Sequence, residues 1–222
     1  MTRQFKKCLI TGATGSGGSY LVEHILKKNL NIKLFGFYRS NSYLKLLKKA
    51  HKNKIKFTKV DLANFNHVKK SLLKIKPDLI FHLASNADVR GSFDNPLEHV
   101  KNNNIVTANL LEALRELNLK PLIIISSTSE VYGNVKKNKM PITEKQEIAP
   151  INPYAVTKTF QDLLSQVYSK TYKFNIIITR MFSYINARRD NLFPTAFAKQ
   201  IIKCEKYNKK YIFHGNLKSI RT

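Results

Sequence analysis

The sequence has only two cysteines and no tryptophan, and it contains no long apolar run. Neither Cys8 nor Cys204 has a second cysteine or a histidine at metal-ligand spacing, so a disulfide framework and a bound metal are not expected. No stretch of eighteen apolar residues is present, so a membrane-spanning helix is not expected either. The residues before Cys8 lead directly into a short apolar run rather than a signal-peptide core, and we therefore expect a cytoplasmic protein.

Acidic residues are also scarce. There are 14 of them against 39 basic residues, which gives a formal net charge of +25 and favours a polyanionic partner. However, 31 of the basic residues are lysines spread along the chain, whereas a dedicated nucleic-acid surface concentrates arginine and interleaves it with aromatic residues. We therefore predict no specific nucleic-acid partner and interpret the charge as a solvated lysine-rich surface that attracts anionic ligands.

Glycine and proline are infrequent too, and the 43% of hydrophobic residues is enough to bury one core. Short β-branched runs alternate with segments of helical periodicity, which predicts an α/β fold of Rossmann type, a doubly wound parallel sheet with helices on both faces. The expected strands are Cys8–Thr11, Lys33–Tyr38, Ile55–Val60, Leu79–Leu83, Leu122–Ser126, Ile176–Thr179 and Tyr211–His214. The expected helices are Gly18–Lys28, Tyr43–Lys52, Asn64–Lys76, Leu97–Leu117, Tyr154–Tyr172 and Pro194–Lys206. Residues 133–153 are expected to form one long irregular loop.

A glycine-rich turn, Thr11-Gly12-Ala13-Thr14-Gly15-Ser16-Gly17-Gly18, joins the first expected strand to the first expected helix. Glycine lets the backbone approach a pyrophosphate, and the N-terminus of the following helix offers N–H groups and a partial positive charge. A tight turn needs glycine without any ligand, but the position between a strand and an amphipathic helix favours a dinucleotide site. The residues of the turn predicted to contact this cofactor are Gly12, Thr14, Gly15, Ser16 and Gly18.

The end of the second expected strand lacks the acidic residue that would hold the ribose of NAD. No acid lies between Glu23 and Asp61, and Arg39 follows the strand instead. An acid there would repel a 2′-phosphate, whereas a guanidinium pairs with it. A surface arginine without a special role is the alternative interpretation. We predict that the cofactor is NADP rather than NAD.

A tyrosine and a lysine stand four residues apart after the fifth expected strand. Tyr154 and Lys158 fall on one face of a helix, so the ammonium can favour the phenolate and make Tyr154 a general base. This spacing alone is common in a lysine-rich chain and also fits a solvated helix face. Here it follows the glycine turn and the hydroxyl-bearing segment Ser127-Thr128-Ser129, in the order that hydride chemistry requires.

These segments together resemble the extended short-chain dehydrogenase/reductases, the NAD-dependent epimerase/dehydratase family, and are most similar to its GDP-mannose 4,6-dehydratase branch. The spacing G-x-x-G-x-x-G and the triplet Thr128-Ser129-Glu130 carry the resemblance. It implies that Thr128 hydrogen-bonds the sugar of a sugar nucleotide and that Glu130 is the acid/base for elimination. It also implies that Tyr154 and Lys158 contact the cofactor and manage the hydride step, and that the protein is a homodimer or homotetramer.

Further segments agree with the resemblance. Asp61-Leu62 is similar to the pair that meets the adenine, and Leu83-Ala84-Ser85 is similar to a segment that lies along the cofactor. Arg189 is similar to an arginine in a loop that reaches a neighbouring subunit's cofactor, although Ala187 stands where the family usually has proline. The residues implied to contact the substrate are Ser127, Asn216 and Arg221.

The resemblance sets an expectation for domain organisation. Residues 1–180 are expected to form the NADP-binding domain, and residues 181–222 the start of a substrate-binding lobe that is largely missing, because family members continue for roughly a hundred residues more. Because these residues are missing, the sequence alone does not predict full activity for this chain.

Several alternatives stay open. A 4-epimerase or a 4-keto reductase of the same fold needs no carboxylate at position 130, but a UDP-glucuronate decarboxylase can carry the same triplet. Arg188-Arg189 and Gly215–Arg221 favour the GDP-mannose dehydratase. A truncated module that binds NADP or RNA without turnover is an alternative of a different class.

Overall fold

The structure, a computed structural model, describes residues 4–28, 30–39, 44, 47, 49, 51, 54–190 and 192–215. The chain divides into two compact units, Met1–Met181 and Phe182–Thr222. The first unit holds a parallel sheet and its covering helices, and the described part of the second unit holds the helix α7 (Phe193–Tyr207). None of the described helices is long and apolar enough to cross a membrane.

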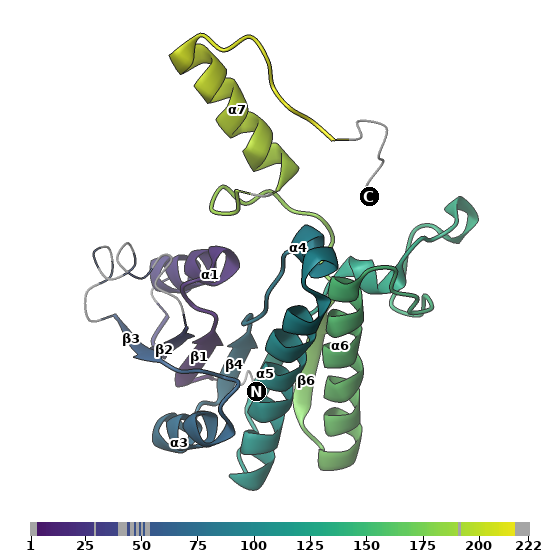
Figure 1. Ribbon diagram of the computed structural model, residues 1–222. Coiled ribbons are helices and arrows are strands. Elements are labelled where there is room, and N and C mark those ends of the chain that lie inside the picture. Colours follow the sequence, from purple (N-terminus) through teal and green to yellow (C-terminus); the bar gives the residue numbers. More distant parts are fainter. Residues whose placement is uncertain are drawn as a thin grey trace. The chain divides into compact units, whose positions relative to one another are not determined.

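Six parallel strands form the sheet of the first unit. They are β1 (Lys7–Thr11), β2 (Lys33–Tyr38), β3 (Ile55–Lys59), β4 (Leu79–His82), β5 (Leu122–Ser126) and β6 (Asn175–Thr179). Their order in the sheet is β3-β2-β1-β4-β5-β6, so the direction of winding reverses between β1 and β4 (Figure 1). The carboxyl ends of two such strands open into a crevice, which is where open α/β sheets bind ligands.

Helices cover both faces of this sheet. They are α1 (Ser16–Lys27), α3 (Phe65–Ile75), α4 (Val89–Asp94), α5 (Pro96–Glu116) and α6 (Pro153–Tyr172). Successive side chains of β1 point to opposite faces: Leu9 packs in the core cluster with α3 and α5, and Cys8 and Ile10 pack in the cluster with α1. The expected doubly wound fold is therefore confirmed.

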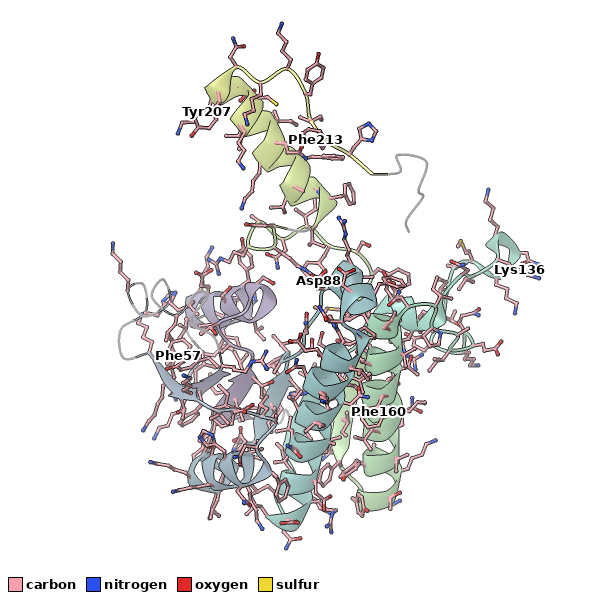
Figure 2. The ribbon with its side chains drawn as sticks, in the orientation of Figure 1. Phe57, Asp88, Lys136, Phe160, Tyr207 and Phe213 are labelled. Carbon is pink, nitrogen blue, oxygen red and sulfur yellow. The ribbon has the colours of Figure 1, made fainter. Side chains whose placement is uncertain are left out.

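Local sequence explains where the two long helices begin. Pro96 and Pro153 stand at the first positions of α5 and α6, where a missing N–H is harmless. The side chain of Asn152 caps α6 by accepting a hydrogen bond from the N–H of Ala155. Between the short 3-10 helix η1 (Ser129–Tyr132) and α6, a long loop with a second 3-10 turn, η2 (Lys137–Lys139), extends from the domain and carries Lys136 at its end (Figure 2).

Two sequence-based expectations differ from the structure. The strand expected at Tyr211–His214 is not a strand, because no described strand lies beside it to complete the pairing. Instead, the side chain of Gln200 in α7 accepts from the N–H of Phe213 at 2.7 Å and donates to its carbonyl at 3.0 Å. The helix α4 was not predicted, since it is only six residues long and contains Gly91. The helix expected at Tyr43–Lys52 lies largely outside the described residues.

Candidate active site

The glycine turn after β1 has the backbone geometry that a phosphate-binding turn needs. Gly12 has a φ of +68°, and a Cβ atom there would lie 3.0 Å from the backbone of Ala84 on β4's side of the crevice. Gly18 serves packing instead, because a Cβ atom there would overlap the carbonyl oxygen of Gly12. Gly15 is the N-cap of α1, and this helix has no side-chain cap and no acidic residue in its first turn. The N-terminus of α1 is therefore suited to bind an anion.

One cavity lies beside this turn, and predicted cofactor residues line it from four segments of the chain. They are Gly12, Thr14, Gly15, Arg39, Asp61, Leu62, Leu83, Ala84 and Ser85. The structure places Ser16, Gly18, Tyr154 and Lys158 outside this lining. The lining also includes residues that sequence reasoning missed, namely Phe37, Tyr38, Val60, Asn86, Asn102 and Val106.

Arg39 is held at the rim of this cavity by a residue of α5. Its Nη1 donates to Oδ1 of Asn102 at 2.7 Å, and Nδ2 of Asn102 donates to Glu98 at 3.3 Å. The guanidinium has further N–H groups beyond the one used here, and these can meet an anion in the cavity. The position of Arg39 thus follows from packing between β2 and α5, sixty-three residues apart.

The segment after β5 carries the predicted sugar-binding and elimination residues. Ser127 continues the pairing with β6, since its N–H donates to the carbonyl of Thr179 at 2.8 Å. The hydroxyl of Thr128 caps η1 by accepting from the N–H of Glu130 at 3.3 Å. Ser127 and Thr128 are buried, and the Ser127 hydroxyl has no hydrogen-bond partner among the described residues. Most buried hydroxyls have a hydrogen-bond partner, so the Ser127 hydroxyl has an unused donor and acceptor.

Lys158 is almost fully buried, only 3% exposed, and its Nζ donates to Oε1 of Gln161 at 2.7 Å. Burial lowers the pKa of Lys158 to about 7, and the negative charge of Asp162 opposes this only in part. Tyr154, one turn earlier, is 8% exposed, and its N–H donates to the hydroxyl of Ser92 in α4. The pair therefore faces the protein interior rather than solvent, which removes the alternative of a solvated helix face.

A chain of buried hydrogen bonds joins Lys158 to the glycine turn. Nε2 of Gln161 donates to the Thr107 hydroxyl at 2.6 Å, and that oxygen lies 2.9 Å from Nε2 of His82. Nδ1 of His82 lies 2.8 Å from the hydroxyl of Thr11, the residue before Gly12. Burial, together with the positive charge of Lys158, lowers the pKa of His82 to about 3, so the imidazole is neutral.

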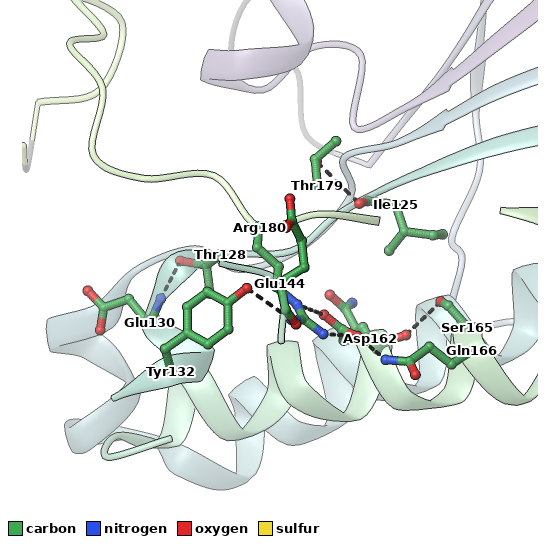
Figure 3. A network of polar contacts seen from close by, with 11 residues as sticks. Ile125, Thr128, Glu130, Tyr132, Glu144, Asp162, Ser165, Gln166, Thr179 and Arg180 are labelled. Carbon is green, nitrogen blue, oxygen red and sulfur yellow. Dashed lines mark hydrogen bonds and ion pairs between the residues drawn. The ribbon is translucent and has the colours of Figure 1, made fainter. Parts of the chain in front are cut away.

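A second polar cluster fixes η1 against α6 and β6 (Figure 3). Nε of Arg180 donates to the fully buried carboxylate of Asp162 at 2.8 Å, and its Nη1 donates to the Tyr132 hydroxyl at 3.0 Å and to the carbonyl of Glu144 at 3.2 Å. The guanidinium also stacks over the Tyr132 ring, 5.2 Å from its centroid. Arg180 thereby ties η1, which carries Glu130, to the helix that carries Tyr154.

The remaining predicted residues lie elsewhere. Arg189 belongs to the second compact unit, where its N–H donates to the carbonyl of Asn186 at 3.0 Å. Asn216 and Arg221 lie outside the described residues. Sequence reasoning missed Asn152, whose Nδ2 donates to Glu130 at 2.7 Å. An asparagine directly before a helix-starting proline was the available signal, but it indicates only the cap.

A family model for GDP-mannose 4,6 dehydratase matches residues 9–222. The chain belongs to this family. It is 30% identical to the GDP-mannose 4,6-dehydratase of Vibrio cholerae, over 97% of this chain and 60% of that enzyme. The membership confirms the extended short-chain dehydrogenase/reductase expected from the sequence.

Solved structures of related enzymes share the fold. The UDP-glucuronic acid 4-epimerase of Bacillus cereus, solved with UDP-glucuronic acid and NAD, is 29% identical with a TM-score of 0.77, over 89% of this chain and 63% of that one. The UDP-N-acetylglucosamine 4-epimerase of Methanobrevibacter ruminantium is 26% identical with a TM-score of 0.80, over 96% of this chain and 67% of that one. The family thus contains dehydratases and epimerases of sugar nucleotides, and this chain spans about two thirds of their length or less.

The burial of Lys158 predicts how stability changes with pH. Between about pH 7 and the ordinary lysine pKa of 10.5, Lys158 is neutral in the folded chain and charged in the unfolded chain. The unfolded state then binds more protons, so the free energy of unfolding rises with pH across this window. Lys158→Met removes this contribution, and the wild type should gain stability relative to the variant by on the order of a few kcal/mol from pH 7 to 10.

Chemical denaturation at several pH values measures this difference. Lys170→Met, at an exposed position of the same helix, controls for the change in net charge. Parallel pH curves for the wild type and Lys158→Met would contradict a buried, uncharged amine.

Proposed function

We propose that this chain is the cofactor-binding part of a sugar-nucleotide 4,6-dehydratase that uses NADP and acts on GDP-mannose. The observation that carries the proposal is the link between Glu130 and the start of α6. Asn152 donates to the Glu130 carboxylate at 2.7 Å, and Tyr154 follows two residues later. The Glu130 carboxylate is thereby tied to the first turn of the helix that carries Tyr154, and a carboxylate and a phenol are the two groups that a dehydration through a ketone requires.

The cavity beside the glycine turn supports a dinucleotide cofactor. The N-terminus of α1 lacks a side-chain cap and has no acid in its first turn, and Arg39 stands at the rim. Backbone N–H groups at such a helix end suit a pyrophosphate, and Arg39 suits the 2′-phosphate of NADP. When bound, the nicotinamide supplies the chemistry of accepting a hydride from carbon 4 of the hexose and returning it to carbon 6.

The residues of the chain then move protons. Tyr154 takes the proton of the hydroxyl on carbon 4 as that carbon is oxidised to a ketone. The ketone acidifies carbon 5, so Glu130 removes its proton, and the electron pair forms a double bond to carbon 6. The hydroxyl on carbon 6 leaves as water with the proton from Glu130. Reduction of carbon 6 leaves an enolate, which takes a proton at carbon 5 from solvent while Tyr154 releases the proton it took from the hydroxyl, so the only net loss is one water molecule.

The rival reactions of the same fold differ in their need for Glu130. An epimerase or a 4-keto reductase completes its work at carbon 4 and needs no proton abstraction at carbon 5. A decarboxylase needs a substrate with a carboxylate on carbon 5. The identity of the product from a given sugar nucleotide therefore separates the candidates.

Glu130→Gln should lower the rate of dehydration of GDP-mannose by about 10²–10⁴-fold and leave NADP binding unchanged, because it removes only the acid/base group. The 4-keto-6-deoxy product can be followed by mass spectrometry. Glu147→Gln, at an exposed position of the long loop, is the matched control. Full activity of Glu130→Gln would refute the role of this carboxylate. A product of the wild type with the same mass as GDP-mannose would identify an epimerase.

The position of Arg39 predicts the cofactor preference. A charge-assisted pair with the 2′-phosphate contributes about 1.5–3 kcal/mol, so the wild type should bind NADP at least about tenfold more tightly than NAD. Arg39→Ala should abolish this preference without weakening NAD binding, as measured by calorimetric titration. Arg90→Ala, at an exposed position on α4, controls for the lost charge. Equal affinity of the wild type for both cofactors would remove the role of Arg39.

We further propose a homodimer formed through α6. The helix exposes an apolar stripe at three- and four-residue spacing, and Phe160 lies on its outer side (Figure 2). The stripe consists of Val156, Phe160, Leu163 and Val167. Four exposed apolar residues in a row on one helix form a patch that a partner surface would cover.

Phe160→Glu should convert the dimer into a monomer, because a buried unpaired charge opposes association. Sedimentation velocity at micromolar concentration measures the change. Leu73→Glu, an exposed apolar position on α3, is the control and should remain dimeric. A monomeric wild type would contradict the proposed interface.

A further inference from the structure

Asn152 makes two hydrogen bonds that serve different parts of the site. Its Oδ1 accepts from the N–H of Ala155 at 2.7 Å and so caps α6, and its Nδ2 donates to Oε2 of Glu130 at 2.7 Å. The side chain is buried, with the whole residue only 8% exposed. A single planar amide thus joins the first turn of α6 to the carboxylate on η1.

We propose that Asn152 is a positioning residue that fixes the Glu130 carboxylate relative to Tyr154 for proton removal from the substrate. The inference rests on the proposed function and adds a residue to it. The amide acceptor is engaged by the helix, so the amide cannot rotate without losing the cap. Its N–H therefore points to one place, and the carboxylate is held there.

The backbone and the side chain of Glu130 are held by different groups. The Thr128 hydroxyl accepts from the N–H of Glu130, and the N–H of Gly133 donates to its carbonyl at 3.2 Å. These contacts fix the 3-10 turn but leave the torsions of a long side chain to be set elsewhere. The bond from Asn152 restrains the carboxylate itself.

The chemistry of the amide also suits a base. The amide N–H acts only as a donor to Oε2, so it does not compete for the proton that the carboxylate receives. In the proposed step the proton of carbon 5 moves to the carboxylate and its electron pair forms the bond to carbon 6. A displacement of about 1 Å in such a group lowers a rate by about 10²-fold.

Two substitutions separate this role from helix capping. Asn152→Ser keeps an N-cap oxygen, but its hydroxyl is one bond shorter than the amide nitrogen and does not reach Glu130. Asn152→Asp keeps both the cap and the length, but it sets a second carboxylate against Glu130. Asn64→Ser is the matched control, because Asn64 caps α3 through an equivalent bond from the N–H of His67 at 2.9 Å.

The experiment uses the full chain with NADP and GDP-mannose, and follows two steps in a single turnover. Absorbance of the reduced nicotinamide reports oxidation at carbon 4, and mass spectrometry reports the dehydrated product. In both Asn152 variants, dehydration should fall by about 10²-fold while oxidation keeps its wild-type rate, so reduced nicotinamide accumulates. Asn64→Ser should change neither step, and Asn152→Ser added to Glu130→Gln should cause no further loss.

The outcomes distinguish a failure of the positioning role from a failure of the proposed function. Asn152 variants that dehydrate at the wild-type rate, or that lose both steps by the same factor, would overturn the positioning role and leave a helix cap. Wild-type protein that yields neither reduced nicotinamide nor dehydrated product would overturn the proposed function, and this inference with it.

Discussion

The site depends on the buried imidazole of His82, which bridges the strand pair where the sheet reverses its winding. His82 ends β4, and its two ring nitrogens meet the hydroxyls of Thr11 at the end of β1 and Thr107 on α5. Because the ring is buried and neutral, both contacts are needed to satisfy it. The glycine turn and the inner face of α5 are thereby held in one arrangement. Lys158 is joined to this frame through Gln161.

The same buried contacts determine the protonation state of the Lys158 amine. The side-chain amide nitrogen of Gln161 donates to the Thr107 hydroxyl and to the carbonyl of Asn103. The amide oxygen therefore faces the amine of Lys158 and accepts from it. Desolvation outweighs the attraction of Asp162, and the amine is half-charged near neutral pH. The carboxylate of Asp162 pairs with Arg180, so it does not also pair directly with the Lys158 amine to favour the charged ammonium. The carboxylate of Asp162 therefore helps Arg180 to hold η1 and does less to keep Lys158 charged.

The sequence predicted the sheet well because the apolar runs of buried parallel strands are a local signal. The glycine turn followed from a local motif and part of the cavity lining from the family resemblance, but lining residues such as Phe37, Asn86 and Asn102 did not. The partners of the site residues did not, since Arg39 and Asn102, or Thr11 and His82, are joined only by tertiary packing. The strand expected at Tyr211–His214 fails for the same reason, because its apolar pattern specifies no partner to pair with.

The scarcity of acidic residues is a second constraint, and it acts on the ligands rather than on the fold. Several of the 14 carboxylates have structural contacts: Asp78 accepts from the N–H groups of Lys6 and Lys7, and Glu112 pairs with Arg115. The 39 basic residues therefore outnumber any possible partners, and the surface potential is positive. Both proposed ligands carry a diphosphate, so this potential attracts each of them alike. Selection between them must come from local groups such as Arg39 and the segment after β5, because a diffuse field falls off with salt and cannot distinguish two polyanions.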